Sequence, residues 1–597
     1  MKRNIKVILM GCALGITGLA SCTDGYEAEP VENFTLDYIF SETDSMGTQA
    51  RQYLNNIYRH LQPGHNRVAS DFLDAASDDA ISIEWDESEV YRIAMGQYTA
   101  NNRISSEMQW GYYYTTIREV AEFIANIDRV PFKLTYVKAG ETRTDADGNL
   151  VRTPLNVTMK AEARFLRALA YFEMVKRYGG VPLMGDKIYS LEDNLELPRN
   201  TFAECVNYIV SELDAIKDDL RGLPMEGTDP TNYTAAATRE ACMGLKSRVL
   251  LYAASKLFNE EPLERGNELV GYASYDRNRW KLAADAAWEF ISTFGHNGSG
   301  TINLTPNFRD VFLNWYSSAN PEIIWYIHGE MGGFNLEKNN GPLGFTGKGL
   351  ALGRTLPTQN LVEAFPMKDG KKIGESKYPY TPETQYENRD PRLDMTVLHN
   401  GSNWLGRQLA TYEGGGNNPT SSALYTRTSY YMCKFMGNYS VGKTEYENQN
   451  HPWVYLRYAE ILLNYAEAQN EFEGPNENVY DCLIALRKRA GIEAGDNNLY
   501  GLKKPMTQDE MREAIYNERR IEMAFEEQRF FDIRRWKIAG KCFAEPVHGL
   551  SITNRDGRLN FAQNDVLNVK WNNRRYLYPI PYSEVVKNSN MVQNPNW

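Results

Sequence analysis

The chain has 597 residues, of which 42% are hydrophobic and 24% are charged, so it is long enough for several domain-sized units and does not have the composition of a disordered protein. Acidic residues outnumber basic ones by 77 to 65, and the net charge of −12 argues against a protein built to coat nucleic acid. Aromatic residues are abundant, with 11 Trp, 38 Tyr and 23 Phe. This surplus of aromatic side chains is the feature of the composition that needs an explanation.

The N-terminus is typical of a bacterial lipoprotein signal. Three basic residues precede the almost wholly apolar run 7–20, which reaches about 21 Å as a helix, short of a bilayer core of about 30 Å. The following Leu19-Ala20-Ser21-Cys22 resembles a lipobox, with an ordinary secretion signal and a chance cysteine as the alternative. We therefore predict a signal peptide over 1–21, acylation (palmitate) at Cys22 and an acidic, lipid-anchored tether over 22–48.

Residues 49–294 are predicted to form a helical region. Apolar residues recur at helical spacing in Gln49–Leu61, Ser105–Ile127, Met159–Tyr178, Phe202–Leu220, Ala235–Phe258 and Trp280–Phe294. Met159–Tyr178 carries two adjacent apolar stripes, which suit a helix packed between neighbours, as in a tetratricopeptide-like solenoid. No strict 34-residue repeat is visible. Four basic residues of this helix are predicted to face solvent: Lys160, Arg164, Arg167 and Lys176.

A hairpin is predicted over Thr135–Thr153, turning at Asp147-Gly148. The segment 145–149 superficially resembles a calcium loop, but its glycine is misplaced and no glutamate stands at position 12. We favour a simple turn and assign no cofactor, while a structural calcium ion elsewhere stays open.

Residues 295–452 are rich in Gly, Asn, Pro and Tyr, which predicts a loop-rich, ligand-binding insertion with a strand at Glu322–His328. In the C-terminal region, 453–597, three further helices are expected: Val454–Phe472, Asn478–Ala490 and Gln508–Phe525. The last begins with a capping box at Thr507 and Glu510. Its apolar face carries Glu518, which should need an arginine partner. The candidates are Arg457, Arg489 and Arg529.

The cysteines show neither a CxxC motif nor regular spacing. Five remain after a cut before Cys22, if that residue is acylated: Cys205, Cys242, Cys433, Cys482 and Cys542. We predict mainly buried single thiols, with no disulfide framework and no zinc site.

Several sequence blocks resemble the SusD/RagB family, in the family's order and over nearly the whole mature chain. The upstream blocks are Ala161-Glu162-Ala163-Arg164-Phe165-Leu166-Arg167-Ala168 and Tyr178–Pro182, followed by Arg389-Asp390-Pro391-Arg392. The C-terminal blocks are 458–468, Arg487-Lys488-Arg489-Ala490-Gly491, Asn517-Glu518-Arg519-Arg520-Ile521-Glu522, Arg529–Trp536, Tyr578-Pro579-Ile580-Pro581 and Asn594-Pro595. Agreement of several ordered blocks is far more specific than one motif.

The resemblance implies a mainly α fold, with a tetratricopeptide-like helical scaffold, loop-rich insertions and small β-hairpins. It also implies a non-enzymatic nutrient-uptake lipoprotein at the outer membrane of a Bacteroidetes-type bacterium, facing the exterior. Such a protein binds a glycan and passes it to a SusC-like, TonB-dependent transporter. The ligand itself is not readable from the sequence.

A glycan site needs exposed aromatic rings beside polar groups, because the C–H faces of sugars stack on aromatic side chains. Trp110, Trp280, Trp453 and Trp536 lie in helical or family blocks and are interpreted as packing residues, while Trp325 in a strand pattern stays open. The candidates for stacking are Trp85, which follows a Ser-Asp-Asp-Ala stretch like the one that precedes an aromatic contact in the family, then Trp315, Tyr316, Trp404 and Tyr91.

Two other classes of function are considered. A tetratricopeptide-like scaffold that binds protein, or a transporter lid for a nutrient such as peptide, fits the same helical pattern. A glycoside hydrolase would need a carboxylate pair, and the eight acidic residues within 71–89 could supply one. No pattern singles out an acid and a nucleophile, and the sequence has no HExxH, G-x-S-x-G or P-loop motif, so catalysis is disfavoured.

Overall fold

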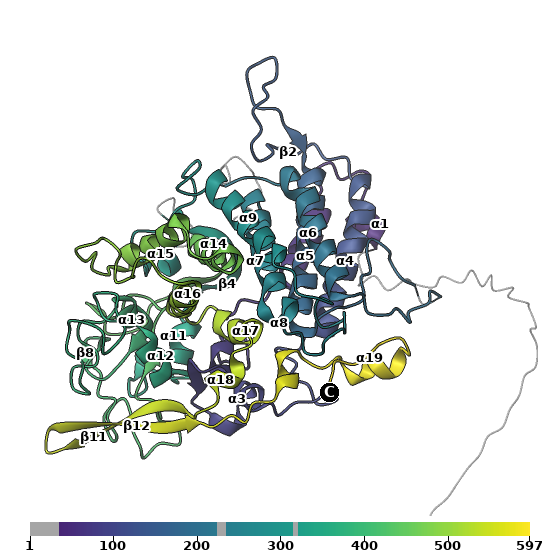
Figure 1. Cartoon of the computed structure of the whole chain (residues 1–597). Helices are drawn as coiled ribbons and strands as arrows, with labels where there is room; N and C mark the ends of the chain where they lie inside the picture. The colour runs from purple at the N-terminus through teal and green to yellow at the C-terminus, as the bar shows by residue number, and fades with distance from the viewer. Residues whose placement is uncertain (1–34, 191, 224–234, 315–319) are drawn as a thin grey trace, which may run out of the picture.

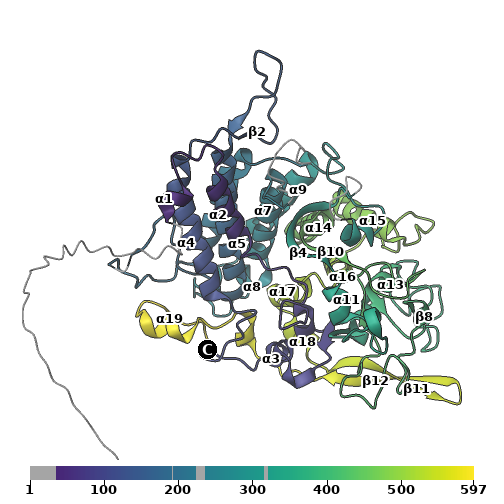
Figure 2. The ribbon, with the colours of Figure 1, turned by 180° about the vertical axis from the view of Figure 1, so that it is seen from behind.

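The computed structural model describes residues 35–190, 192–223, 235–314 and 320–597, and it is mainly α-helical, as predicted (Figure 1). Six long helices form the N-terminal half: α2 (Thr48–Tyr58), α4 (Trp110–Asn126), α5 (Leu155–Tyr178), α6 (Phe202–Ile216), α7 (Arg239–Ala254) and α9 (Asn278–Thr293). Neighbours in this array contact one another, α4 with α5, α5 with α6 and α7 with α9, and both views show them side by side (Figures 1 and 2).

The array continues into the C-terminal part of the chain, because α9 packs against α14 (Tyr458–Glu473). The latter contacts α15 (Glu477–Ala490) and α16 (Gln508–Glu522). The shorter helices are α1 (Leu36–Ile39), α3 (Glu89–Met95), α8 (Lys256–Asn259), α10 (Asp310–Leu313), α11 (Asn335–Asn340), α12 (Gln359–Ala364), α13 (Arg392–Thr396), α17 (Gln528–Arg535), α18 (Ala539–Cys542) and α19 (Tyr582–Lys587).

Strands occur only as antiparallel pairs within the described part of the chain. The pairs are β1 (Ala80–Ser82) with β5 (Thr355–Pro357), β2 (Thr135–Tyr136) with β3 (Thr153–Pro154), β4 (Ile323–Gly333) with β10 (Gln449–Arg457), β6 (Val397–Leu398) with β9 (Tyr431–Met432), β7 (Asn403–Trp404) with β8 (Arg407–Gln408), and β11 (Val547–Arg555) with β12 (Arg558–Leu567). The last pair extends from the body as a long hairpin (Figure 1).

Several predicted helix boundaries are wrong, including the starts at Ser105 and Ala235, since α4 begins at Trp110 and α7 at Arg239. Residues 454–457, predicted to open a helix, belong to β10, because their backbone groups pair with β4 more than a hundred residues away. The predicted helix Ala235–Phe258 is interrupted at Ser255, whose extended backbone separates α7 from α8.

Residues 35–48, predicted as the last part of a tether over 22–48, are folded onto the body. From Thr35 onward the chain folds onto the helical region: α1 forms and Phe40 is fully buried, with its ring against Tyr53 and Phe123. Burying an aromatic side chain holds this stretch on the body. The predicted signal peptide and Cys22 lie outside the described residues. Among the described helices, none combines the length and apolarity needed to cross a bilayer.

The predicted hairpin is confirmed by the β2–β3 pair and a bridge between Thr144 and Leu150. The Asp145 carboxylate accepts hydrogen bonds from the backbone N–H groups of Asp147 and Asn149, so it stabilises the turn itself. No cluster of metal-ligating side chains occurs in the part of the chain that the structure describes. The five predicted thiols are free, and all but the half-buried Cys542 are buried, as predicted.

Two basic residues of α5 are buried more deeply than predicted, and Glu518 of α16 has other arginine partners than the three expected. Arg167 and Lys176 were expected in solvent, but α5 is enclosed by its neighbours, and they pair with Glu212 and Glu173 at 2.8 Å. The arginine partner predicted for Glu518 is present, but the residues are Arg392 and Arg487, each at 2.8 Å. The three arginines expected there bind other acids. Arg457 and Arg489 pair with Glu322 and Glu522, and Arg529 pairs with Asp78.

The tryptophans interpreted as packing residues are buried: Trp110, Trp280, Trp453 and Trp536. Trp325, left open by the sequence, is also part of the core. Its indole N–H donates to the carbonyl of Ala235 at 2.9 Å, and its ring packs edge-on against Phe165 and Tyr455.

Candidate functional site

Two of the predicted stacking residues, Trp85 and Tyr91, lie side by side at the surface. Their ring centroids are 5.3 Å apart, and both side chains are half-buried. Ser88 ties them together, since its hydroxyl donates to the carbonyl of Trp85 at 2.9 Å and accepts the N–H of Tyr91 at the start of α3. The helix cap therefore fixes the spacing of the two rings.

The backbone of Trp85 has a φ of 55°, in the left-handed region. A bulky side chain rarely adopts this conformation, which costs about 1–3 kcal/mol and persists only where the surroundings impose it. Such outliers cluster at functional sites. Trp85 is thus held in a strained, half-exposed position.

Arg427 comes from the loop-rich region and lies over the indole of Trp85, with its guanidinium carbon 3.7 Å from the ring centroid. One guanidinium N–H donates to the carbonyl of Ser82 at 3.2 Å. Burial lowers the pKa of Arg427 to about 10, and no carboxylate of the described residues lies within ion-pair distance. Its remaining N–H groups can therefore donate to a ligand. Nearby Tyr425 exposes 40% of its surface.

The segment that leads to Trp85 is clamped by arginines of α16 and α17. Asp78 accepts two hydrogen bonds from Arg529, each at 2.8 Å, and Asp79 accepts one from Arg520 at 2.7 Å. Burial alone would raise the pKa of Asp78. The charges of Arg520 and Arg529 outweigh burial and hold this pKa well below its usual range. Strand β1, which pairs with β5, lies between these two aspartates and Trp85 in the sequence. These contacts fix the platform formed by Trp85, Tyr91 and Arg427 to the core of the protein.

The other predicted stacking residues do not join this cluster. Trp404 is fully buried: its indole N–H donates to the hydroxyl of Tyr446 at 3.1 Å, and the ring of Tyr439 packs edge-on against it. The prediction that Trp404 offers an exposed face is therefore wrong, because neighbouring tyrosines cover the ring and satisfy its donor. Trp315 and Tyr316 lie outside the described residues.

Arg427 and Tyr425 were missed by sequence reasoning. They lie more than 330 residues beyond Trp85, and no local motif marks them. An arginine flanked by threonines and a tyrosine is common in loops. Only the packing of the loop-rich region against β1 brings the guanidinium to the indole.

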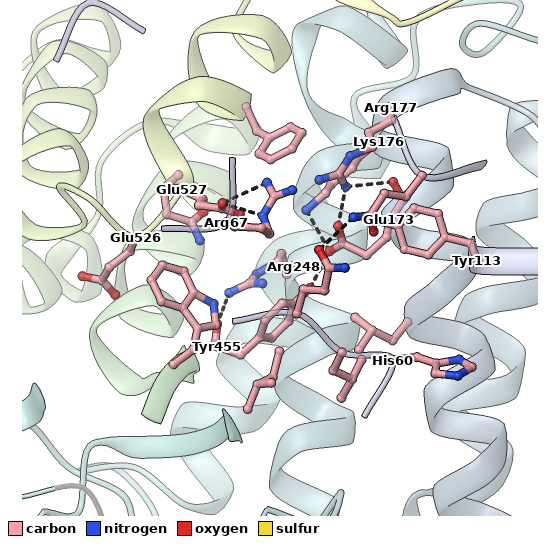
Figure 3. Close-up of a pocket in the computed structure, with 18 of the residues that line it drawn as sticks. His60, Arg67, Tyr113, Glu173, Lys176, Arg177, Arg248, Tyr455, Glu526 and Glu527 are labelled. Atoms are coloured by element: carbon pink, nitrogen blue, oxygen red, sulfur yellow. Dashed lines mark hydrogen bonds and ion pairs between the residues drawn. The ribbon is translucent and has the colours of Figure 1, made fainter. Parts of the chain in front are cut away.

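A second feature is a small, charged cavity between the helical array and the C-terminal region, shown in Figure 3. Its volume of about 80 Å³ is room for two or three water molecules at roughly 30 Å³ each. The lining charges are paired: Arg67 with Glu527, Arg177 with Glu173, and Lys176 also with Glu173 (Figure 3). Ligand pockets usually enclose about 300–1,000 Å³, so this cavity is smaller than a typical ligand pocket.

Comparison with known proteins agrees with the fold. The model of the SusD family matches residues 321–597, and a second model, described as starch-binding and associating with the outer membrane, matches residues 37–251. SusD-like protein P2 of Formosa agariphila is 24% identical over 437 residues, 73% of each chain.

Solved structures show the same architecture. A SusD-like protein from Bacteroides fragilis is 25% identical, with a TM-score of 0.72, and the match covers 95% of this chain and 100% of the other. A SusD-like carbohydrate-binding protein from the same organism is 22% identical, with a TM-score of 0.69 and coverage of 92% and 99%. Two family models along most of the chain, relatives of the same class and a shared fold lead to one conclusion. The chain belongs to the SusD/RagB family.

Proposed function

We propose that the protein binds a glycan on the platform of Trp85, Tyr91 and Arg427 and passes it to a SusC-like, TonB-dependent transporter. Acylated Cys22 would anchor it to the outer membrane, with the body facing the exterior. The observation that carries the proposal is the indole of Trp85, strained and half-exposed between a second aromatic ring and an arginine that forms no ion pair with the described residues.

The chemistry of these groups fits a sugar. The aromatic rings offer apolar surface to the C–H face of a pyranose, while guanidinium N–H groups donate to its hydroxyl oxygens. The hydroxyl of Tyr91 and the exposed carboxylate of Asp86 add acceptors beside the rings. The site holds and orients a ligand, and no bond-breaking step is proposed for it.

The experiment is calorimetry and affinity electrophoresis of the lipid-free protein against a polysaccharide panel. For a glycan that binds, Trp85→Ala should weaken binding at least tenfold, the loss of about 1.4 kcal/mol expected when a central aromatic contact is removed. Tyr275→Ala is the matched control, since Tyr275 is 52% exposed and remote in sequence. An unchanged affinity in Trp85→Ala would place the site elsewhere.

The alternative is a scaffold or lid that engages peptide. Intrinsic tryptophan fluorescence separates the two, because a sugar that stacks on Trp85 changes the environment of its indole. A response to peptides and none to any glycan would favour the alternative.

A further inference from the structure

A larger groove lies between α12 and α16, away from the cavity of Figure 3. Its volume is about 470 Å³, within the range of ligand pockets, and its lining includes Glu363, Lys372, Tyr380, Glu513 and Asn517. The two helices are joined at its base, where the amide of Asn517 donates to the carbonyl of Ala364 at 3.0 Å. The groove is therefore a built part of the fold.

Tyr380 supplies an aromatic wall. The guanidinium carbon of Arg389 lies 5.6 Å from its ring centroid. Arg389 is buried and held by three backbone carbonyls, those of Gln385 and Val362 at 2.6 Å and that of Phe365 at 2.7 Å. A guanidinium within about 6 Å of a ring centroid attracts the ring electrostatically and so favours this position of Tyr380. The half-exposed ring thus resembles the platform of the first site, with an arginine beside an aromatic ring.

Hydrogen-bond acceptors surround this wall. Glu363 and Glu513 are exposed, and neither forms an ion pair within the described residues. Both bonds from Gln359 and Gln563 fall on one oxygen of Glu363, which leaves the other free to accept. With Lys372, the three ionised side chains sum to one negative charge. Hydroxyl groups suit these acceptors, whereas the field disfavours an anionic ligand.

The hairpin β11–β12 links the groove to the first site. The side chain of Gln563 donates to Glu363 at 2.8 Å, while that of the next residue, Asn564, donates to the carbonyl of Arg427 at 3.1 Å. Consecutive Cα atoms are 3.8 Å apart, so standard bond lengths keep the bonded Glu363 Oε1 and the carbonyl oxygen of Arg427 within about 20 Å of each other. Consecutive side chains of a strand point to opposite faces, so a polysaccharide that reaches both sites has to pass around the edge of the hairpin.

We propose that this groove is a second carbohydrate subsite, selective for neutral glycans, with Tyr380 as its stacking residue and Glu363 and Glu513 as hydroxyl acceptors. A long chain then engages both subsites, and the second contact raises affinity without a stronger first one. The inference rests on the proposed function, because it extends glycan binding from the Trp85 platform.

The test uses affinity electrophoresis of the lipid-free protein in gels that contain soluble starch, laminarin, xylan, galactomannan or polygalacturonate. For a neutral polysaccharide that retards the wild type, Tyr380→Ala should weaken binding at least fivefold, and Trp85→Ala/Tyr380→Ala should abolish it. Tyr380→Phe keeps the ring and should bind like the wild type. Glu513→Ala changes an exposed residue and should also weaken binding. It keeps the test valid if Tyr380→Ala does not fold. Tyr378→Ala is the control, since Tyr378 bonds to Glu493 instead of lining the groove.

The outcomes separate the two proposals. If no polysaccharide retards the wild type, both are overturned. If Trp85→Ala weakens binding but Tyr380→Ala and Glu513→Ala do not, the second subsite is overturned and the first stands. Retardation by polygalacturonate that depends on Tyr380 would overturn the selectivity for neutral glycans. Calorimetry with fragments of the retarding polysaccharide should show that Tyr380→Ala affects long fragments only.

Discussion

Arg392 lies fully buried among three carboxylates and provides a quantitative test of how the interior is held. Its guanidinium pairs with Asp390 at 2.7 Å and with Glu518 and Glu522 at 2.8 Å each. Replacing it by methionine keeps an unbranched side chain but removes the charge. The change therefore probes the ion pairs more than the packing.

The magnitude follows from what each acid retains. Glu518 keeps Arg487, and Glu522 keeps Arg457, but Asp390 has no other ion-pair partner among the described residues. Removing one partner of a buried pair costs about 3–5 kcal/mol, because an uncompensated charge stays in the interior. With a single acid orphaned, Arg392→Met should lower the free energy of unfolding by about 3–5 kcal/mol at pH 7.5.

The assay is urea unfolding followed by tryptophan fluorescence at pH 7.5 and 5.0. An orphaned buried carboxyl takes up a proton more readily, so the loss should shrink at pH 5.0. Adding Asp390→Asn should recover most of the loss. The control is Arg118→Met, whose salt bridge to Glu122 is exposed and should contribute less than about 0.5 kcal/mol. A loss below 1 kcal/mol, or an equal loss at both pH values, would refute the reasoning.

Three further predictions concern other parts of the fold. Burial raises the pKa of Asp71 to about 7 despite its bond from a serine, so the native state holds this proton and loses stability as pH rises from about 4 through 7. Asp71→Asn should flatten the pH dependence of the free energy of unfolding, measured with urea. Above pH 7 its free energy of unfolding should exceed that of the wild type by up to about 4 kcal/mol. An unchanged pH dependence would count against this reasoning. Thr507→Ala removes the capping box of α16 and should cost about 1 kcal/mol, with Thr507→Ser neutral by the same measurement. Gly344→Ala should cost about 1–3 kcal/mol more than Gly401→Ala, because both have positive φ but only the first puts a Cβ 1.7 Å from a backbone carbonyl oxygen. Equal melting temperatures for the two variants would contradict this.

Local pattern was sufficient for most of the helices and for two residues of the candidate site. Apolar periodicity placed α5 and α15 because helical hydrogen bonds join residues four apart, so the signal lies within one stretch of sequence. The predicted start of α14 at Val454 was wrong for the opposite reason. Residues 454–457 belong to β10, which pairs with a strand far away in the chain. Trp85 and Tyr91 were found because they share one short polar segment.

What only the tertiary structure decided are the contacts between distant segments. The loops that meet in space decide which arginines neutralise Glu518. They also place Arg427 over the indole of Trp85. The burial of Trp404 depends equally on tyrosines from another loop. The sequence by itself determined the helices and the family and indicated a candidate site, because these rest on nearby residues. The ion-pair partner of a buried acid and the exposed fraction of an aromatic ring depend on long-range packing, which no single segment of the sequence encodes.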